Sequence, residues 1–312
     1  MNKNMLTELS DILNSRFSGL PCEARRLFHG RGRCYEGLEQ LTVDWLKPVL
    51  LVSIFKEQED SFYASLSEML LVFASSPKWK EAGGEHILVQ HRDRIDSPSE
   101  VVVGSIPEQL EITENGLTFL LDIGKRQNNG LFLDMRFGRK WVMANSQNKR
   151  VLNLFAYTCG FSVAAIQGGA QKVVNLDMAK SSLARGRDNH RLNAHDLSKV
   201  SFMGHDIFKS WGKLRKNGPY DLVVIDPPSF QKGSFVLTKD YAKILRRLPE
   251  LVAENGEVLA CVNAPDVGVE FLLEQMKEQA PEFAFVCRLE NPPEFEDISD
   301  QSALKVMHFV RG

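Results

Sequence analysis

Residues 221–230 read Asp-Leu-Val-Val-Ile-Asp-Pro-Pro-Ser-Phe, an apolar run that ends in a carboxylate and two prolines. An apolar run of this length beside turn residues predicts a buried strand, Tyr220–Ile225. Each proline fixes its own φ and restrains the residue before it, so the loop that begins at Asp226 is expected to be rigid. Neither proline has an amide proton, which leaves nearby carbonyls able to accept hydrogen bonds from a polar substrate edge.

The aromatic residue that closes this stretch, Phe230, is placed to stack on a planar ring. The alternative is a rigid proline turn with a phenylalanine in the core. The candidate catalytic residues of the stretch are Asp226, Pro227, Pro228 and Phe230.

Strands and helices alternate on both sides of this stretch. Short apolar runs predict further strands at Val151–Phe155, Lys172–Asp177, Val200–Phe202 and Glu257–Val262. Helices are expected between them, at Gly160–Gly168, Ala179–Asn193 and Thr238–Val252. This alternation predicts an α/β fold with a doubly wound, mostly parallel sheet. Such sheets bind ligands at the carboxyl ends of their strands, so the polar residues there are the ones to examine.

The earlier part of the chain has a mixed α+β pattern. Helices are expected at Asn4–Phe17 and Ser61–Phe73, and strands at Leu41–Phe55 (two, with a turn), His86–His91, Val101–Val103 and Leu117–Ile123. The expected domains are an N-terminal helix (1–24), a smaller mixed α+β domain that could bind RNA (25–125), and a Rossmann-like catalytic domain (126–312). Short edge strands within Leu41–Phe55 could pair between the subunits of a homodimer.

Three strand ends carry candidate ligand-binding residues. Gly160 would let the backbone of the first turn approach a ligand closely, although an ordinary strand-to-helix turn is the alternative. Asp177 could accept hydrogen bonds from a ribose diol, with Met178 beside an adenine face, or it could cap the next helix. Asp206 could accept from an exocyclic amine between Ile207 and Phe208, or it could be a turn aspartate.

The composition is that of a globular protein. Net charge is −2, from 38 basic and 40 acidic residues, which argues against a uniformly basic surface but leaves room for a local basic face. The five cysteines form no C-x-x-C pair, so neither a disulfide scaffold nor a metal site is expected. No apolar run is long enough to span a membrane, and residues 1–8 lack a signal-peptide core; a cytoplasmic location is expected.

The order of these motifs resembles the class I S-adenosylmethionine-dependent methyltransferases. Residues 127–136, Gln-Asn-Asn-Gly-Leu-Phe-Leu-Asp-Met-Arg, are similar to the Q-x-x-G-x-F-x-D-x-R segment of one group. Residues 37–44, Gly-Leu-Glu-Gln-Leu-Thr-Val-Asp, are similar to its G-L-P-G-L-T-V-D strand. That group consists of large-subunit ribosomal RNA methyltransferases that modify cytosine C5 or guanine N7, and the resemblance runs from about Arg25 to the C-terminus.

The resemblance implies a seven-stranded sheet and S-adenosylmethionine as the cofactor, with S-adenosylhomocysteine as the product. Asp134 and Arg136 match the ammonium and carboxylate of the cofactor's amino acid moiety, although a surface ion pair is the alternative. The implied cofactor-binding residues are Phe132, Asp134, Arg136, Asn153, Phe155, Ala156, Thr158, Gly160, Phe161, Ser162, Asp177, Met178, Asp206, Ile207, Phe208 and Asp226.

The sequence departs from the cytosine-C5 members at their nucleophile. Those members need a cysteine thiolate after the strand that here is Glu257–Val262, because C5 is not nucleophilic until a thiolate adds to C6. Asn263 stands at that position, and Cys261 is expected to be buried in the strand. Guanine-N7 members have asparagine in this region, and N7 needs only positioning against the methyl donor. Methyl transfer to a base nitrogen is therefore favoured, with Asn263 as a further catalytic candidate.

Residues before Arg25 are too few for the PUA domain that usually begins the cytosine-C5 members. RNA binding would then depend on basic clusters mixed with aromatic residues, although a solvated charged loop is the alternative. The basic candidates are Arg25, Arg26, Arg31, Arg33, Arg92 and Arg94. Two alternatives for the whole chain are a methyltransferase that acts on a small molecule or protein, and a noncatalytic module that binds S-adenosylmethionine or RNA. A nicotinamide-dependent dehydrogenase is less favoured, because the sequence lacks the glycine pattern of its dinucleotide-binding turn.

Overall fold

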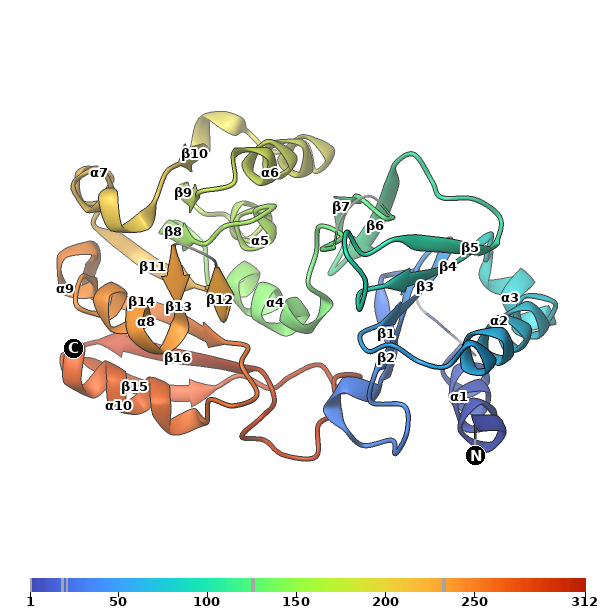
Figure 1. Cartoon of the computed structure of the whole chain (residues 1–312). Coiled ribbons are helices and arrows are strands. Elements are labelled where there is room, and N and C mark those ends of the chain that lie inside the picture. The colour runs from blue at the N-terminus through green and yellow to red at the C-terminus, as the bar shows by residue number, and fades with distance from the viewer. Residues whose placement is uncertain (1, 18–19, 21, 125–126, 232–233) are drawn as a thin grey trace. The chain divides into compact units, whose positions relative to one another are not determined.

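The computed structural model describes residues 2–17, 20, 22–124, 127–231 and 234–312 (Figure 1). These residues form two compact units. One unit is Met1–Leu133 with Pro292–Ile298, and the other is Asp134–Asn291 with Ser299–Gly312. The domain boundary expected between residues 125 and 126 lies outside the described residues.

The second unit is built on the predicted seven-stranded sheet. Its strands lie side by side in the order β10 (Val200–Gly204), β9 (Lys172–Asp177), β8 (Arg150–Leu154), β11 (Tyr220–Ile225), β14 (Val252–Val262), β16 (Lys305–Arg311) and β15 (Phe283–Arg288). The first five are parallel, and β16 runs antiparallel to both of its neighbours. The order reverses between β8 and β11, which is where a doubly wound sheet binds its ligand.

Helices cover both faces of this sheet (Figure 1). One face carries α4 (Arg136–Ala144), α5 (Gly160–Gln167) and α6 (Lys180–Leu192), and the other carries α7 (Trp211–Asn217), α8 (Leu237–Leu245), α9 (Leu248–Leu251) and α10 (Val269–Gln279). Side chains of β11 alternate between these layers: Leu222 and Val224 pack toward α4 and α5, whereas Val223 and Ile225 pack toward α8. The apolar run of β11 is therefore buried on both faces, as the sequence predicts.

The prediction of a single helix at Thr238–Val252 is wrong. The structure has α8 and α9 instead, and Val252 already belongs to β14. Pro249 lies in the first turn of α9, where its missing amide proton costs nothing, but it could not continue α8.

The first unit contains a five-stranded sheet. Its order is β1 (Arg25–His29), β2 (Leu41–Leu46), β3 (Val49–Ile54), β4 (His86–His91) and β5 (Ser99–Val103). Three helices bury their apolar sides against it, α1 (Asn2–Arg16), α2 (Asp60–Ala74) and α3 (Pro77–Ala82). A separate hairpin pairs β6 (Leu110–Glu114) with β7 (Leu117–Leu121) through a turn at Asn115 and Gly116, both with positive φ.

Two strands of this sheet correct an expectation about subunit pairing. Both β2 and β3 lie inside the sheet and are paired on both sides, so Leu41–Phe55 offers no free edge to a second subunit. Because β2 runs antiparallel to both β1 and β3, and β3 runs parallel to β4, the strands β1, β3 and β4 all point the same way. Their carboxyl ends therefore share one edge of the sheet. Among the described residues, no helix is long and apolar enough to cross a membrane.

Candidate active site

Asp226 follows β11 directly, at the carboxyl edge of the large sheet. Its side chain is half-buried. Burial is the main cause that raises the pKa of this carboxyl from its ordinary 3.8 to about 7, and the nearby charge of Asp134 raises it further against the opposing effect of Arg139. Asp226 can therefore gain or lose a proton near neutral pH, as a group that handles protons in catalysis must do.

Asn263 connects two of the predicted segments at the same edge. It follows β14, and its Nδ2 donates to Oδ2 of Asp134 over 3.0 Å. Its main-chain oxygen accepts a hydrogen bond of 2.6 Å from the Ser229 hydroxyl in the proline loop. The structure thus brings together Asp134, Asp226 and Asn263, which the sequence had singled out in three separate motifs.

A buried tyrosine that the sequence did not reveal ties two strand ends together. The Tyr241 hydroxyl, on α8, lies 3.2 Å from the carbonyl oxygen of Cys261 and 3.4 Å from that of Ile225. These carbonyls lie in the last two residues of β14 and in the last residue of β11, the strands that lead into Asn263 and Asp226. Buried tyrosines need a partner for the hydroxyl, and here that partner is the backbone beneath the site.

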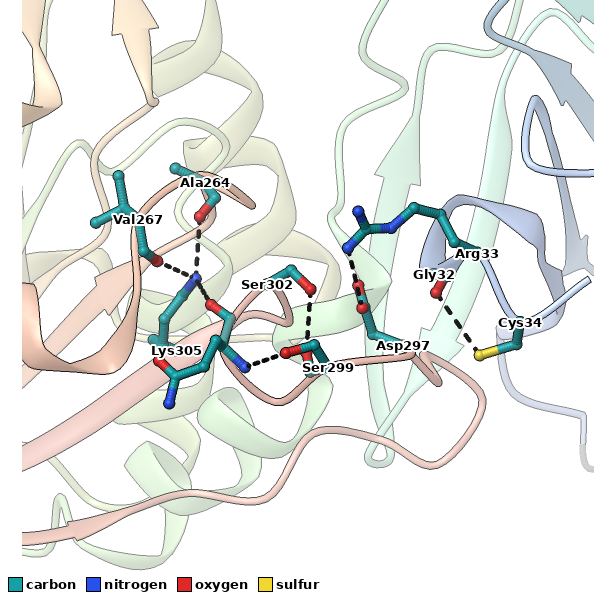
Figure 2. Close-up of polar contacts among 10 residues, drawn as sticks. Gly32, Arg33, Cys34, Ala264, Val267, Asp297, Ser299, Ser302 and Lys305 are labelled. Atoms are coloured by element: carbon teal, nitrogen blue, oxygen red, sulfur yellow. Dashed lines mark hydrogen bonds and ion pairs between the residues drawn. The ribbon is translucent and has the colours of Figure 1, made fainter.

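A buried lysine holds the loop after Asn263 (Figure 2). The Lys305 side chain, at the start of β16, is fully buried, and its ammonium donates to the main-chain oxygens of Ala264 (3.0 Å), Gln301 (2.8 Å) and Val267 (2.5 Å). An ammonium has three donors, so these three carbonyls satisfy it completely. Lys305 therefore fixes the Ala264–Val267 turn to the segment that leads into β16.

The turn after β8 has unusual backbone geometry. Phe155, Tyr157 and Cys159 have φ values of 57°, 47° and 64°, in the left-handed region that residues other than glycine rarely adopt. Three such residues within one turn indicate strain that the surroundings must hold, which is common at ligand-binding sites. Gly160, which we expected to allow close approach, starts α5 directly after this turn.

Asp177 holds this strained turn. Its Oδ2 accepts from the Tyr157 amide over 2.8 Å, and its Oδ1 accepts from the Ala179 amide over 2.7 Å. Burial nevertheless raises its pKa above the ordinary value, because desolvation outweighs the backbone hydrogen bonds. Asp177 does not occupy the N-cap position of α6, which is Ala179.

Asn153 and Ser162 use their side chains within the core. Asn153 donates to Asn175 over 2.9 Å, Asn175 donates to the Ser162 hydroxyl over 2.9 Å, and that hydroxyl lies 2.8 Å from Nε2 of His190. Desolvation is the main cause that lowers the pKa of His190 to about 3, so its imidazole is neutral. This buried chain stabilises β8, β9 and α5, and cofactor contact by Asn153 or Ser162 stays a prediction.

The other predicted residues differ in accessibility. Ala156, Thr158, Phe161 and Ile207 are buried, while Phe155, Arg136 and Phe208 are half-buried. Asp206 accepts a hydrogen bond of 2.9 Å from the Phe208 amide, so it caps its own short turn. Phe230 and Met178 are 66% and 46% exposed. Phe132, also exposed, belongs to the first unit, so its contact with the cofactor stays a prediction.

The carboxylates at the carboxyl edge of the large sheet favour a ligand with positive charge. The carboxylates of Asp134, Asp177 and Asp226 all lie at the carboxyl ends of the central strands or on the segment bonded to Asn263. Such an edge suits a ligand that carries a positive centre and hydroxyl donors. Among the described residues, no group of three His, Cys, Asp or Glu side chains could hold a metal ion.

A family model described as S-adenosylmethionine-dependent methyltransferase matches residues 25–310. The chain belongs to that family. Its cofactor, S-adenosylmethionine, carries a sulfonium, an ammonium and a ribose diol; contact of these groups with Asp134, Asp177 and Asp226 stays a prediction. The predicted fold, enzyme class and cofactor are thereby confirmed.

Proteins with similar sequences are found in Bacillus and Aeromonas. The Bacillus subtilis protein YwbD, a candidate ribosomal RNA large subunit methyltransferase by name, is 28% identical over 307 residues, which cover 94% of this chain and 75% of that protein. Ribosomal RNA large subunit methyltransferase I of Aeromonas salmonicida is 32% identical over 232 residues. That match covers 72% of this chain and 57% of the Aeromonas protein.

A solved structure matches almost the whole chain. SMU.776, described as a candidate methyltransferase crystallised with SAH, has a TM-score of 0.84 and 27% sequence identity. The match covers 99% of this chain and 81% of SMU.776. A protein of this fold therefore binds the demethylated form of the cofactor, S-adenosylhomocysteine.

Proposed function

We propose that this chain transfers the methyl group of S-adenosylmethionine to a base of ribosomal RNA, directly and without a covalent cysteine intermediate. The cofactor supplies a methyl group on a sulfonium centre and becomes S-adenosylhomocysteine. The substrate class is proposed from the names of the relatives in Bacillus and Aeromonas, whose printed names specify large-subunit ribosomal RNA. The single observation that supports direct transfer is the position of Asn263. It is hydrogen-bonded to Asp134 at the strand end where a covalent mechanism would need a cysteine thiol.

The cysteines near the strand ends support the absence of a covalent step. Cys261 and Cys159 are both fully buried. Burial is the main cause that raises the pKa of each thiol well above 9, so neither forms the thiolate that attack on C6 of a pyrimidine requires. The base must therefore supply its own lone pair, as a ring or exocyclic nitrogen does.

In this proposal Asp226 acts on the substrate's polar edge. Above pH 7 its carboxylate accepts a hydrogen bond from an N–H of the base and orients the ring against the methyl donor. If the target nitrogen itself carries a hydrogen, the N–C bond forms as the S–C bond breaks, and Asp226 is the group that receives the released proton. Phe230, which is largely exposed in the loop that begins at Asp226, provides a ring on which the base stacks.

The experiment uses tritiated S-adenosylmethionine and ribosomal RNA purified from a strain that lacks the gene. The protein is expected to label that RNA, and nuclease mapping to place the label on one base. RNA from the parent strain, already methylated in the cell, is the control and should take little label. Label that appeared only in protein or in small molecules would contradict the proposed substrate.

Two finer expectations accompany the proposal. The enzyme would work in the cytoplasm, where its substrate is made, and it could act as a homodimer. Light scattering of the purified protein measures the mass that distinguishes monomer from dimer.

A further inference from the structure

Three residues follow the strands that end at one edge of the five-stranded sheet. Arg31 lies in the short turn Gly30–Gly32 after β1, Phe55 follows β3, and Arg92 follows β4. Because β1, β3 and β4 point the same way, the fold gathers these residues although they lie up to 61 positions apart, the difference between 92 and 31.

Both arginines stack on the same aromatic ring. The guanidinium carbon of Arg31 lies 4.2 Å from the centroid of the Phe55 ring, and that of Arg92 lies 5.0 Å from it. Arg92 also donates from Nη2 to Oδ1 of Asn128 over 3.2 Å, and its amide donates to the Ile54 carbonyl over 2.8 Å. The ring and these hydrogen bonds hold two long side chains in one place, which lowers the entropy lost when they bind a ligand.

Arg31 differs from the neighbouring arginines because they form ion pairs with carboxylates. Arg25 pairs with Glu23 at 2.8 Å, Arg26 with Asp44 at 2.5 Å, and Arg33 with Asp297 at 3.5 Å, the last visible in Figure 2. No carboxylate lies within ion-pair distance of Arg31 in the part of the chain that the structure describes. Its side chain is exposed. Of the four arginines between positions 25 and 33, Arg31 is the one that forms no ion pair with a carboxylate of the described residues.

The electrostatic environment favours an anion at this point. Desolvation, and then the charge of Arg26, lower the pKa of Arg31 below its ordinary value. An arginine remains protonated even so, and two guanidinium groups on one ring repel each other. A bound anion would relieve that repulsion, and the planar fork of arginine matches the oxygens of a phosphate.

We propose that Arg31 and Arg92, held on the Phe55 ring, form a binding site for the phosphate backbone of the RNA substrate. This inference rests on the proposed function, since it gives the first unit its part in holding ribosomal RNA. Contacts of this kind position the RNA and carry no sequence information. The site therefore contributes affinity that depends on salt, while the choice of base is made at the carboxyl edge of the large sheet.

The test is binding of a single-stranded ribosomal RNA fragment, measured by filter binding at several salt concentrations. In the double variant Arg31→Gln/Arg92→Gln, affinity at low salt should fall on the order of tenfold. The slope of log K against log salt should shrink by about 1.4, because each phosphate that is no longer neutralised lowers it by about 0.7. The affinity for S-adenosylmethionine should stay unchanged, which shows that the variant is folded.

The matched control is Arg25→Gln/Arg33→Gln, which removes the same net charge from two arginines that are already ion-paired. Its slope should remain within a few tenths of the wild-type slope. The variant Phe55→Leu keeps both charges but removes the ring, so it should weaken binding a few-fold while the slope stays the same.

Two failures can be told apart. Wild-type protein that bound no RNA would overturn the proposed substrate together with this site. Wild-type binding with the same affinity and slope in Arg31→Gln/Arg92→Gln would overturn the phosphate site alone, and so would an equal loss in the Arg25→Gln/Arg33→Gln control.

Discussion

The two sheets of this protein follow one geometric rule and carry opposite charges. In the seven-stranded sheet, carboxylates stand at the carboxyl ends of two parallel strands: Asp177 is the last residue of β9, and Asp226 follows β11. In the five-stranded sheet, the residues that follow β1 and β4 include the arginines Arg31 and Arg92. Strands that point the same way gather their following residues at one edge, and those residues then decide whether the edge suits a cation or an anion. The net charge of −2 reveals neither edge, because the acidic and basic residues of the whole chain nearly cancel.

The largest effect is expected from the acidic edge. Asp226→Asn keeps the shape of the side chain but cannot accept a proton, so kcat should fall by about 100-fold or more. S-adenosylmethionine binding, measured by calorimetry, should survive. An Asp226→Asn enzyme with wild-type kcat would remove the role assigned to this carboxylate.

The pH dependence follows from the same group. Since its pKa is raised to about 7, the carboxylate that orients the base and receives its proton forms as pH rises through that value, and kcat/KM should increase from pH 6 to pH 8. The folded protein holds this proton while the unfolded chain, with a pKa near 3.8, has lost it, so Asp226 lowers stability increasingly between about pH 4 and pH 7. Asp226→Asn should therefore gain more in Tm at pH 8 than at pH 5.

Lys305 tests how firmly the acidic edge is held. Lys305→Met keeps most of the volume but leaves three buried carbonyl oxygens without their donor, so the free energy of unfolding should fall by about 2–4 kcal/mol. Urea titration measures this. The control is Lys149→Met, whose partner Glu257 is partly exposed, and the loss there should be below about 1 kcal/mol. Equal losses in the two variants would show that the buried ammonium has no special role.

Asp177 tests the cofactor side of the same edge. Asp177→Ala should raise the Kd for S-adenosylmethionine by about tenfold or more, because it removes a charged acceptor and the hydrogen bond that holds Tyr157. Asp177→Asn keeps an acceptor for the Tyr157 amide and should have a smaller effect. Unchanged affinity in Asp177→Ala, measured by calorimetry, would remove the assignment.

The smallest effect is expected at Cys261. Its thiol is fully buried, so Cys261→Ala should cost about 1 kcal/mol of stability and leave kcat within about twofold. Loss of all methyl transfer in this variant, with the fold intact, would restore a covalent mechanism.

The sequence predicts some strands much better than others. Lys172–Asp177 and Tyr220–Ile225 are apolar runs that end in a carboxylate or just before one, and the structure has β9 and β11 with these bounds. The antiparallel strand β15 is not recognisable, because Ala284–Cys287 are exposed and carry no burial pattern. A strand that is buried on both faces has a continuous apolar sequence and can be recognised, whereas an exposed edge strand has no such pattern.

The site shows the same limit. Asp134 and Asn263 each belong to a recognisable motif, but their hydrogen bond joins residues 129 positions apart and only the fold reveals it. Lys305 and Tyr241 were missed because each acts through distant backbone carbonyls, and a single lysine in a strand or a single tyrosine in a helix forms no local pattern.

Steady-state kinetics with a ribosomal RNA fragment compare the two edges in one assay. Asp226→Asn should lower kcat while KM for RNA stays within a few-fold, and Arg31→Gln/Arg92→Gln should raise KM for RNA while kcat is nearly unchanged. This split is the result expected if the acidic edge performs the chemistry and the basic edge holds the RNA. An arginine variant that lost kcat at unchanged KM, or an Asp226→Asn variant that lost only RNA affinity, would contradict it.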